Sequence, residues 1–205
     1  MTSTCTHANG EPAGLVPSGP RPAAVMVRAA GGAVSIRSER ALASGYWLLA
    51  AAPLRAQAKT EWDEWGAAWL RPGVLFAAVS IPACVLHAAV GLGSPQECAG
   101  PLAEALEYGP LFYGPDDFQR EGSYTALLPS SVARLRVQLP GVVTLPQRAL
   151  LLVPAPNVTG PVDGGGPWWV SPLDGPALLC PPDRVVALAR VGRDVLTAGK
   201  GLQGA

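Results

Sequence analysis

The chain has 205 residues, of which 49% are hydrophobic and 15% are charged, and its 15 basic and 15 acidic side chains cancel. This balance excludes a nucleosome-type basic protein and an acidic tail protein, and the apolar fraction is too high for a disordered chain. The length suits one modest domain, while 24 glycines and 22 prolines predict frequent breaks between short elements.

Charge is unevenly spread along the chain. The formal net charge is +4 over residues 1–60, −7 over residues 61–129 and +3 over residues 130–205. Because non-specific affinity for nucleic acid comes from lysines and arginines that neutralise phosphates, any nucleic-acid contact has to be local.

Residues 1–59 are expected to form a flexible or partly ordered tail. Up to about residue 40 the composition shows no helical or strand periodicity. Residues 41–58 resemble a signal peptide, but they lie far from the N-terminus and are interrupted by Pro53 and Arg55. We expect a cytoplasmic protein without membrane contact, because no window approaches about 18 uninterrupted apolar residues. An exported protein whose start is misassigned at Met1 is the alternative.

Residues 60–198 are expected to form a single α+β domain, whose first half is mainly helical. Thr60 and Asp63 resemble a capping box, and the breakers at 71–73 separate this first helix from a buried strand over 74–80. Ser94 and Glu97 form a second capping box. Helices are therefore expected over residues 61–70, 82–90 and 94–108.

The second half has the short apolar runs and turn clusters that are typical of strands. Strands are expected over residues 111–113, 123–128, 142–145, 149–153 and 168–170, and residues 130–137 fit either a helical turn or an edge strand. A last helix over 182–196 should turn Val185, Leu188, Gly192 and Val195 to one face. The expected fold is a short mixed or antiparallel sheet carrying three to four short helices, followed by a disordered C-terminus at 199–205.

The titratable residues offer little chemistry. Cys5, Cys84, Cys98 and Cys180 include no C-x-x-C pair and no neighbouring histidine cluster, so no metal and no cofactor are expected. The even count permits two disulfides, but without an export signal free buried thiols are the expected state. His7 and His87 are the two histidines. Cys84 and His87 share one helical face, and a Cys/His pair acting as nucleophile and base remains an alternative to simple packing.

Two loops contain acidic groups. Asp116 and Asp117 form an adjacent carboxylate pair that could hold a divalent metal, although Gly-Pro-Asp-Asp is also ordinary turn chemistry. The run from Asp163 to Gly166 lacks the remainder of a phosphate-binding loop, and is interpreted as a hairpin connection.

The tryptophans are the leading binding residues. Trp62, Trp65 and Trp69 are spaced to form a stripe along one helix, which indicates either a buried docking face or a partner-binding surface. Trp168 and Trp169 must point to opposite faces of a strand, so one should be exposed. That exposed indole could stack a single-stranded base while Arg134, Arg136 and Arg148 hold phosphates.

Several of these segments carry a resemblance. They are Gly73-Val-Leu-Phe-Ala-Ala-Val-Ser-Ile-Pro, Gly109-Pro-Leu-Phe-Tyr, Tyr124-Thr-Ala-Leu-Leu-Pro, Leu150-Leu-Leu-Val-Pro-Ala-Pro, Trp168-Trp-Val-Ser-Pro and Leu179-Cys-Pro-Pro-Asp. Over roughly residues 61–198 the chain resembles small actinobacterial proteins encoded on integrative or conjugative elements. The order of its strands is also similar to the N-terminal domain of bifunctional primase-polymerases.

The resemblance implies a role in binding rather than in catalysis. Primase-polymerase chemistry needs metal-binding carboxylates on strands, whereas the first strand here has Ala77-Ala78-Val79-Ser80, and no histidine follows His87. The chain is therefore expected to be a non-enzymatic accessory or regulatory protein of a mobile element, with a protein partner and a local nucleic-acid contact. A small enzyme using Cys84/His87 or Asp116/Asp117 is the alternative.

Overall fold

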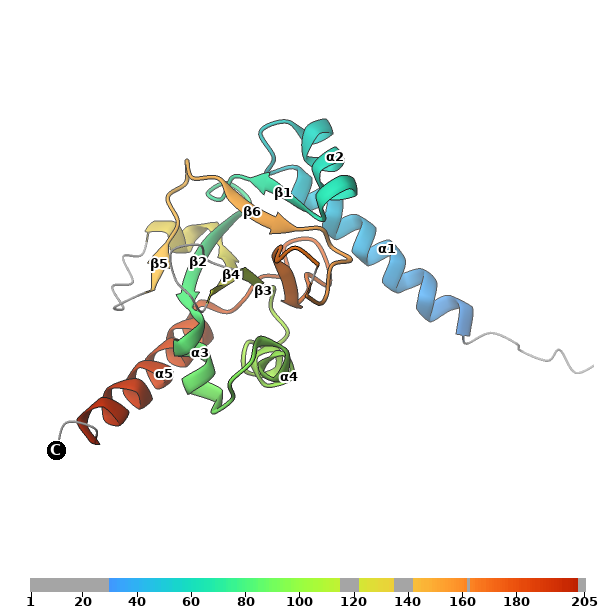
Figure 1. Cartoon of the computed structure of the whole chain (residues 1–205). Coiled ribbons are helices and arrows are strands. Elements are labelled where there is room, and N and C mark those ends of the chain that lie inside the picture. The colour runs from blue at the N-terminus through green and yellow to red at the C-terminus, as the bar shows by residue number, and fades with distance from the viewer. Residues whose placement is uncertain (1–29, 115–121, 135–141, 162, 203–205) are drawn as a thin grey trace, which may run out of the picture.

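The structure, a computed structural model, describes residues 30–114, 122–134, 142–161 and 163–202. Within these ranges the chain forms an α+β fold, shown in Figure 1. Its elements in chain order are α1 (Ala30–Leu49), α2 (Arg55–Trp65), β1 (Ala67–Leu70), β2 (Phe76–Pro82), α3 (Ala83–Val90), α4 (Pro95–Ala105), β3 (Leu111–Gly114), β4 (Ser123–Pro129), the 3-10 helix η1 (Ser130–Arg134), β5 (Val143–Thr144), β6 (Leu151–Pro154), β7 (Trp168–Ser171) and α5 (Pro182–Leu202).

Two antiparallel sheets organise the described chain. The larger has the strand order β5-β2-β4-β3-β7, and the smaller pairs β1 with β6. The predicted α+β class with an antiparallel sheet is confirmed. The described residues contain five α-helices rather than three to four, and two of them are long, because α1 has 20 residues and α5 has 21.

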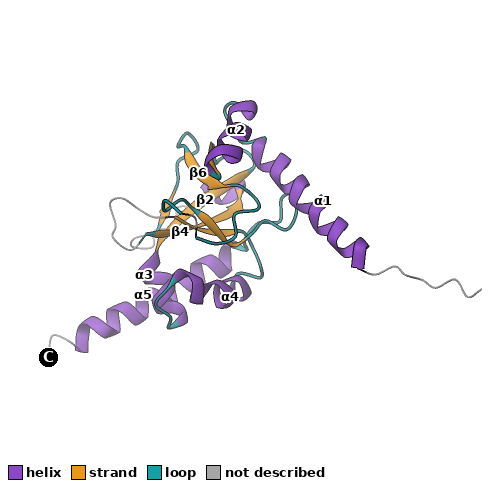
Figure 2. Ribbon diagram, turned by 45° about the vertical axis from the view of Figure 1, so that its right-hand side comes forward, coloured by secondary structure: helices purple, strands orange, loops and turns teal. Residues whose placement is uncertain are grey.

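Both faces of the five-stranded sheet are covered, which explains the nearly continuous apolar strands. In β2, Ala77, Val79 and Ile81 face one core, while Phe76 and Ala78 face a second core. Helices α3, α4 and α5 cover the first face, and the β1–β6 pair with α1 and α2 covers the other (Figure 2). The domain is therefore a three-layer structure with two hydrophobic cores.

Residues 1–59 were expected to form a flexible or partly ordered tail, and the structure shows ordered helix before residue 60 that packs on the domain. Leu48 is fully buried and Leu49 is 8% exposed, so the last turns of α1 belong to the second core. The Arg71 N–H donates to the Ala51 carbonyl over 2.9 Å and ties the end of α1 to β1. Residues 1–29 lie outside the described residues. At the other end α5 continues to Leu202, so residues 199–202 are helical rather than disordered.

Several local predictions are confirmed. Helix α3 ends at Gly91, which adopts a left-handed φ of 72° and donates its N–H to the His87 carbonyl over 2.8 Å. The Ser94 Oγ accepts the Glu97 N–H and caps α4. The ambiguous segment after residue 129 is a 3-10 turn as far as Arg134. One expectation for α5 is wrong: Val195 is 49% exposed, and Ala189 instead is fully buried.

Candidate functional site

The predicted stripe of three tryptophans does not exist, because the helix ends earlier than expected. Gly66 takes a left-handed φ of 70° and donates its N–H to the Trp62 carbonyl, which ends α2 at Trp65. Trp69 therefore lies in β1 rather than on the helix. A glycine reaches this conformation without the steric cost that a side chain would add.

The three indoles have different environments. Trp62 is 9% exposed, and its Nε1–H donates to the Val153 carbonyl over 3.1 Å, so it joins α2 to β6 as a core residue. Trp65 is 67% exposed and Trp69 is 45% exposed. Tryptophan that stays exposed on a rigid element is the residue type most enriched at binding hot spots.

Trp69 forms one wall of a small groove, which we call the Trp69 groove. It has a volume of about 240 Å³. Its lining consists of Pro53, Leu54, Gln57, Ala58, Glu61, Trp69, Arg71 and Leu150. Leu54 and Leu150 are themselves at least half exposed, so the groove opens on an apolar patch.

Glu61 is the charged residue buried in this groove, with 7% of its surface exposed. Its Oε1 accepts a hydrogen bond from Gln57 Nε2 over 2.7 Å, and its Oε2 accepts the Trp69 N–H over 3.2 Å. Among the described residues, no lysine or arginine forms an ion pair with Glu61. Buried carboxylates are normally paired, so this one can accept a cation from outside.

Glu61 and Arg71 are the charged residues among the described residues that line the groove. Of these two, Glu61 is buried and Arg71 is exposed. Asp63 lies on another side of α2, where it lines a hollow against α1 and forms an exposed ion pair with Lys59 over 2.7 Å. Sequence reasoning placed Glu61 only as the first residue of a helix. The sequence feature that could have identified Glu61 is its spacing from Gln57, four residues earlier, which puts both side chains on one helical face.

The expected nucleic-acid residues are not brought together as an exposed stacking site. Trp168 and Trp169 do point to opposite faces, but each face is covered, so they are 5% and 1% exposed. The Trp169 Nε1–H is also held by the Pro154 and Ala155 carbonyls. The expectation of an exposed indole there is wrong. Arg148 is exposed, whereas the Arg134 side chain and Arg136 lie outside the described residues.

Cys84 and His87 do share one hollow, of about 640 Å³, between α3 and the last third of α5. His87 Nε2 and the Tyr124 hydroxyl lie 2.9 Å apart and form a hydrogen bond. Tyr124 is fully buried, and this burial raises its pKa far above the usual value, with a further contribution from Cys98. The Tyr124 hydroxyl is therefore a permanent neutral partner for the imidazole.

The remaining titratable groups do not converge. In the described part of the chain Cys84, Cys98 and Cys180 are free thiols, and no group of three or more His, Cys, Asp or Glu side chains could hold a metal ion. Asp116 and Asp117 lie outside the described residues. No helix in the described ranges is long and apolar enough to span a membrane.

Comparisons with known proteins identify no relative of this chain. No protein-family model matches this chain, and neither the curated proteins nor the solved structures include a match.

Proposed function

We propose that this chain is a non-enzymatic binding protein whose Trp69 groove receives a lysine or arginine side chain of a protein partner. The observation that carries the proposal is the Glu61 carboxylate, which is buried beside the exposed Trp69 and has no cationic partner among the described residues.

The chemistry of a long basic side chain matches this groove. Its methylene stem would pack on Leu54 and Leu150, and its charged end would reach the Glu61 carboxylate. The Trp69 ring offers a face for a cation–π contact. Nucleic acid is the less suitable partner, since a phosphate in the groove would meet the Glu61 carboxylate.

The biological setting follows from the resemblance to proteins of actinobacterial mobile elements. We propose an accessory or regulatory role in the replication or transfer of such an element, in the cytoplasm. The partner would then be a regulator or replication protein that presents a basic residue within an apolar segment.

A defined small probe tests the groove directly. The Trp69 indole N–H resonance of the full chain would be followed by NMR during titration with Nα-acetyl-lysine amide, and with Nα-acetyl-norleucine amide as the uncharged match. We expect the lysine probe alone to shift this resonance, Glu61→Gln to abolish the shift, and Arg71→Ala to increase the affinity. Equal shifts with both probes, or an unchanged response in Glu61→Gln, would overturn the proposal.

A second candidate function is a small enzyme using Cys84 and His87, and it is favoured by the hollow that both residues line. A nucleophilic thiol activated by an imidazole reacts fastest when it ionises near neutral pH. If His87 activates Cys84, iodoacetamide should modify Cys84 more slowly in His87→Gln than in the wild type at pH 7. Equal rates would remove the candidate.

A further inference from the structure

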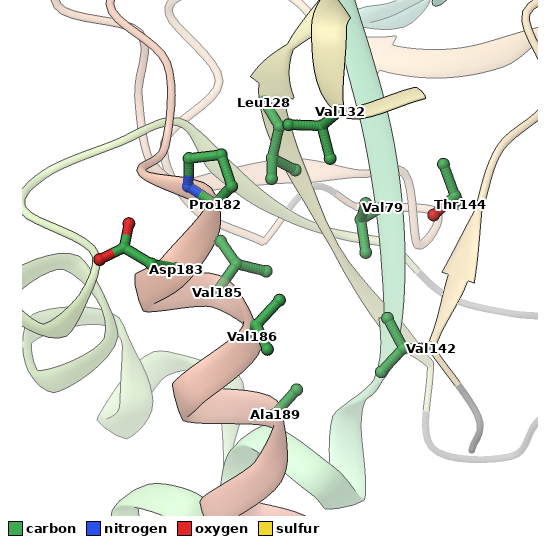
Figure 3. A pocket seen from close by; sticks show the side chains of 10 residues that line it. All are labelled: Val79, Leu128, Val132, Val142, Thr144, Pro182, Asp183, Val185, Val186 and Ala189. Atoms are coloured by element: carbon green, nitrogen blue, oxygen red, sulfur yellow. The ribbon is translucent and has the colours of Figure 1, made fainter. Parts of the chain in front are cut away.

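A separate pocket lies under the first half of α5, as Figure 3 shows. Its volume is about 250 Å³. Its walls come from the sheet, from η1 and from the helix, and the buried ones are Val79, Leu128, Val132, Val185 and Ala189. None of these residues belongs to the Trp69 groove, which is on the other face of the five-stranded sheet.

The packing of α5 explains why space remains here. At Gly192 the helix lies against the Val85 carbonyl of α3, so this point fixes how closely α5 can approach. Nearer its N-terminus the residues that face the sheet are short, with Val185 and Ala189 in the helix and Val79 beneath them. Short side chains on both sides leave a gap that close packing would otherwise fill.

The pocket is lined by aliphatic groups with one hydroxyl on its rim. Among the described residues that line it, Thr144 and Asp183 are the two with polar side chains. Figure 3 shows the Asp183 carboxylate directed away from the other side chains, and Thr144 at the opposite side of the opening. No aromatic ring is among the described lining residues. An ion would lose its hydration without gaining a partner on these walls.

We propose that this pocket is a binding site for a small uncharged aliphatic molecule that carries one hydroxyl or carbonyl oxygen. A cavity of about 150 Å³ accommodates benzene, so by proportion a volume of about 250 Å³ accommodates about ten non-hydrogen atoms. The alkyl part fills the space between Val79, Val185 and Ala189, and the oxygen bonds to the Thr144 hydroxyl.

Three six-carbon probes separate this chemistry from non-specific binding. The full chain, with labelled valine and leucine methyl groups, would be titrated with hexan-1-ol, hexanoate and hexylammonium. We expect saturable methyl shifts for hexan-1-ol, centred on Val79, Leu128 and Val185, and at least tenfold weaker binding of both charged probes. Similar binding of the three probes, or shifts scattered over the surface, would overturn the proposal.

Matched variants locate the site. Val186→Phe places a ring at the pocket opening, whereas Val191→Phe places the same ring on the exposed side of α5. We expect the first variant to raise the Kd for hexan-1-ol at least tenfold and the second to leave it unchanged.

Thr144→Val tests the hydroxyl without adding volume and also serves if Val186→Phe fails to fold. It should weaken hexan-1-ol binding about fivefold through the loss of one hydrogen bond. It should not change the binding of methylcyclohexane. Unaltered hexan-1-ol binding in Thr144→Val would contradict the proposed role of Thr144, and unaltered binding in Val186→Phe would place the ligand elsewhere.

Discussion

Gly192 of α5 lies directly against the backbone carbonyl oxygen of Val85 in α3, with no space between them for a Cβ atom. The oxygen belongs to a helix backbone and cannot rotate away as a flexible side chain would. This contact sets the distance between α3 and α5, two of the three helices that cover one face of the large sheet.

Gly192→Ala should therefore lower the free energy of unfolding by about 1 to 3 kcal/mol, the usual cost of forcing added volume into a packed contact. Gly199→Ala is the matched control, because it lies in the same helix with open space around the position. That control should be neutral or stabilising by up to about 1 kcal/mol, since alanine favours the helix. Urea unfolding of both variants measures the difference. Equal midpoints would show that Gly192 does not lie in close contact with the Val85 carbonyl.

The two tryptophans in α2 should differ sharply in their contribution to stability. Trp62→Ala removes a buried ring and its bond to Val153, and should cost about 3 to 5 kcal/mol. Trp65→Ala changes an exposed side chain, and should stay within about 0.5 kcal/mol of wild type. Thermal unfolding gives both values. A stable Trp62→Ala variant would mean that α2 is not anchored on β6.

The sequence predicted most elements of the large sheet, because its strands are apolar runs between proline and glycine breakers. It also predicted α3 and α4, whose ends have local causes in Gly91 and Ser94. Helix α1 was missed, because its described buried residues lie only between Ser44 and Leu49, too short a stretch to show an amphipathic period. Local sequence carries no signal for such a contact.

The candidate site was predicted only in part. Trp65 and Trp69 were identified as binding residues, but the helix was extended through Gly66, which hid the turn that separates them. The burial of Glu61 depends on the Trp69 N–H from a strand that folds back beside α2. Such a tertiary contact cannot be derived from periodicity. The prediction that Trp168 or Trp169 is exposed was wrong for a related reason. The sequence did not predict that elements would cover both faces of the sheet.

The free energy of unfolding should fall at high pH because buried thiol and phenol groups resist ionisation in the folded state. Burial raises the pKa of the Cys180 thiol from 9.0 to about 12. Below pH 9 the thiol is protonated in both states and its contribution to stability is complete. Between pH 9 and 12 the unfolded chain releases a proton that the folded chain keeps, so the free energy of unfolding falls, by up to about 1.4 kcal/mol per pH unit.

Urea unfolding at pH 8.5, 9.5 and 10.5 measures this dependence. Burial also raises the pKa values of Cys98 and Tyr124, so they act in the same direction, and the contribution of Cys180 is the difference from Cys180→Ala. We expect a shallower fall in the variant. Parallel curves would show that Cys180 ionises as easily in the folded protein as in the unfolded chain.

The described thiols should react in a fixed order. Cys84 is partly exposed in its hollow, whereas Cys98 and Cys180 are fully buried. Iodoacetamide at pH 8 should therefore modify Cys84 at least tenfold faster than the other two, with modification of Cys98 and Cys180 requiring opening of the structure. Peptide mass spectrometry over time assigns each site. Simultaneous modification of all three thiols would contradict the burial of Cys98 and Cys180.

The central claim, that the Trp69 groove holds a basic side chain of a protein partner, is tested most directly by site-specific cross-linking. A photoreactive benzoylphenylalanine at position 65, one helical turn after Glu61 in α2, would be activated in a nuclease-treated lysate of the native host, with the same group at the exposed Tyr46 position as control. We predict a product specific to position 65 whose cross-linked peptide contains lysine or arginine, and which is lost when Glu61→Gln is added. The same products from both positions, or a product that persists in Glu61→Gln, would contradict the claim.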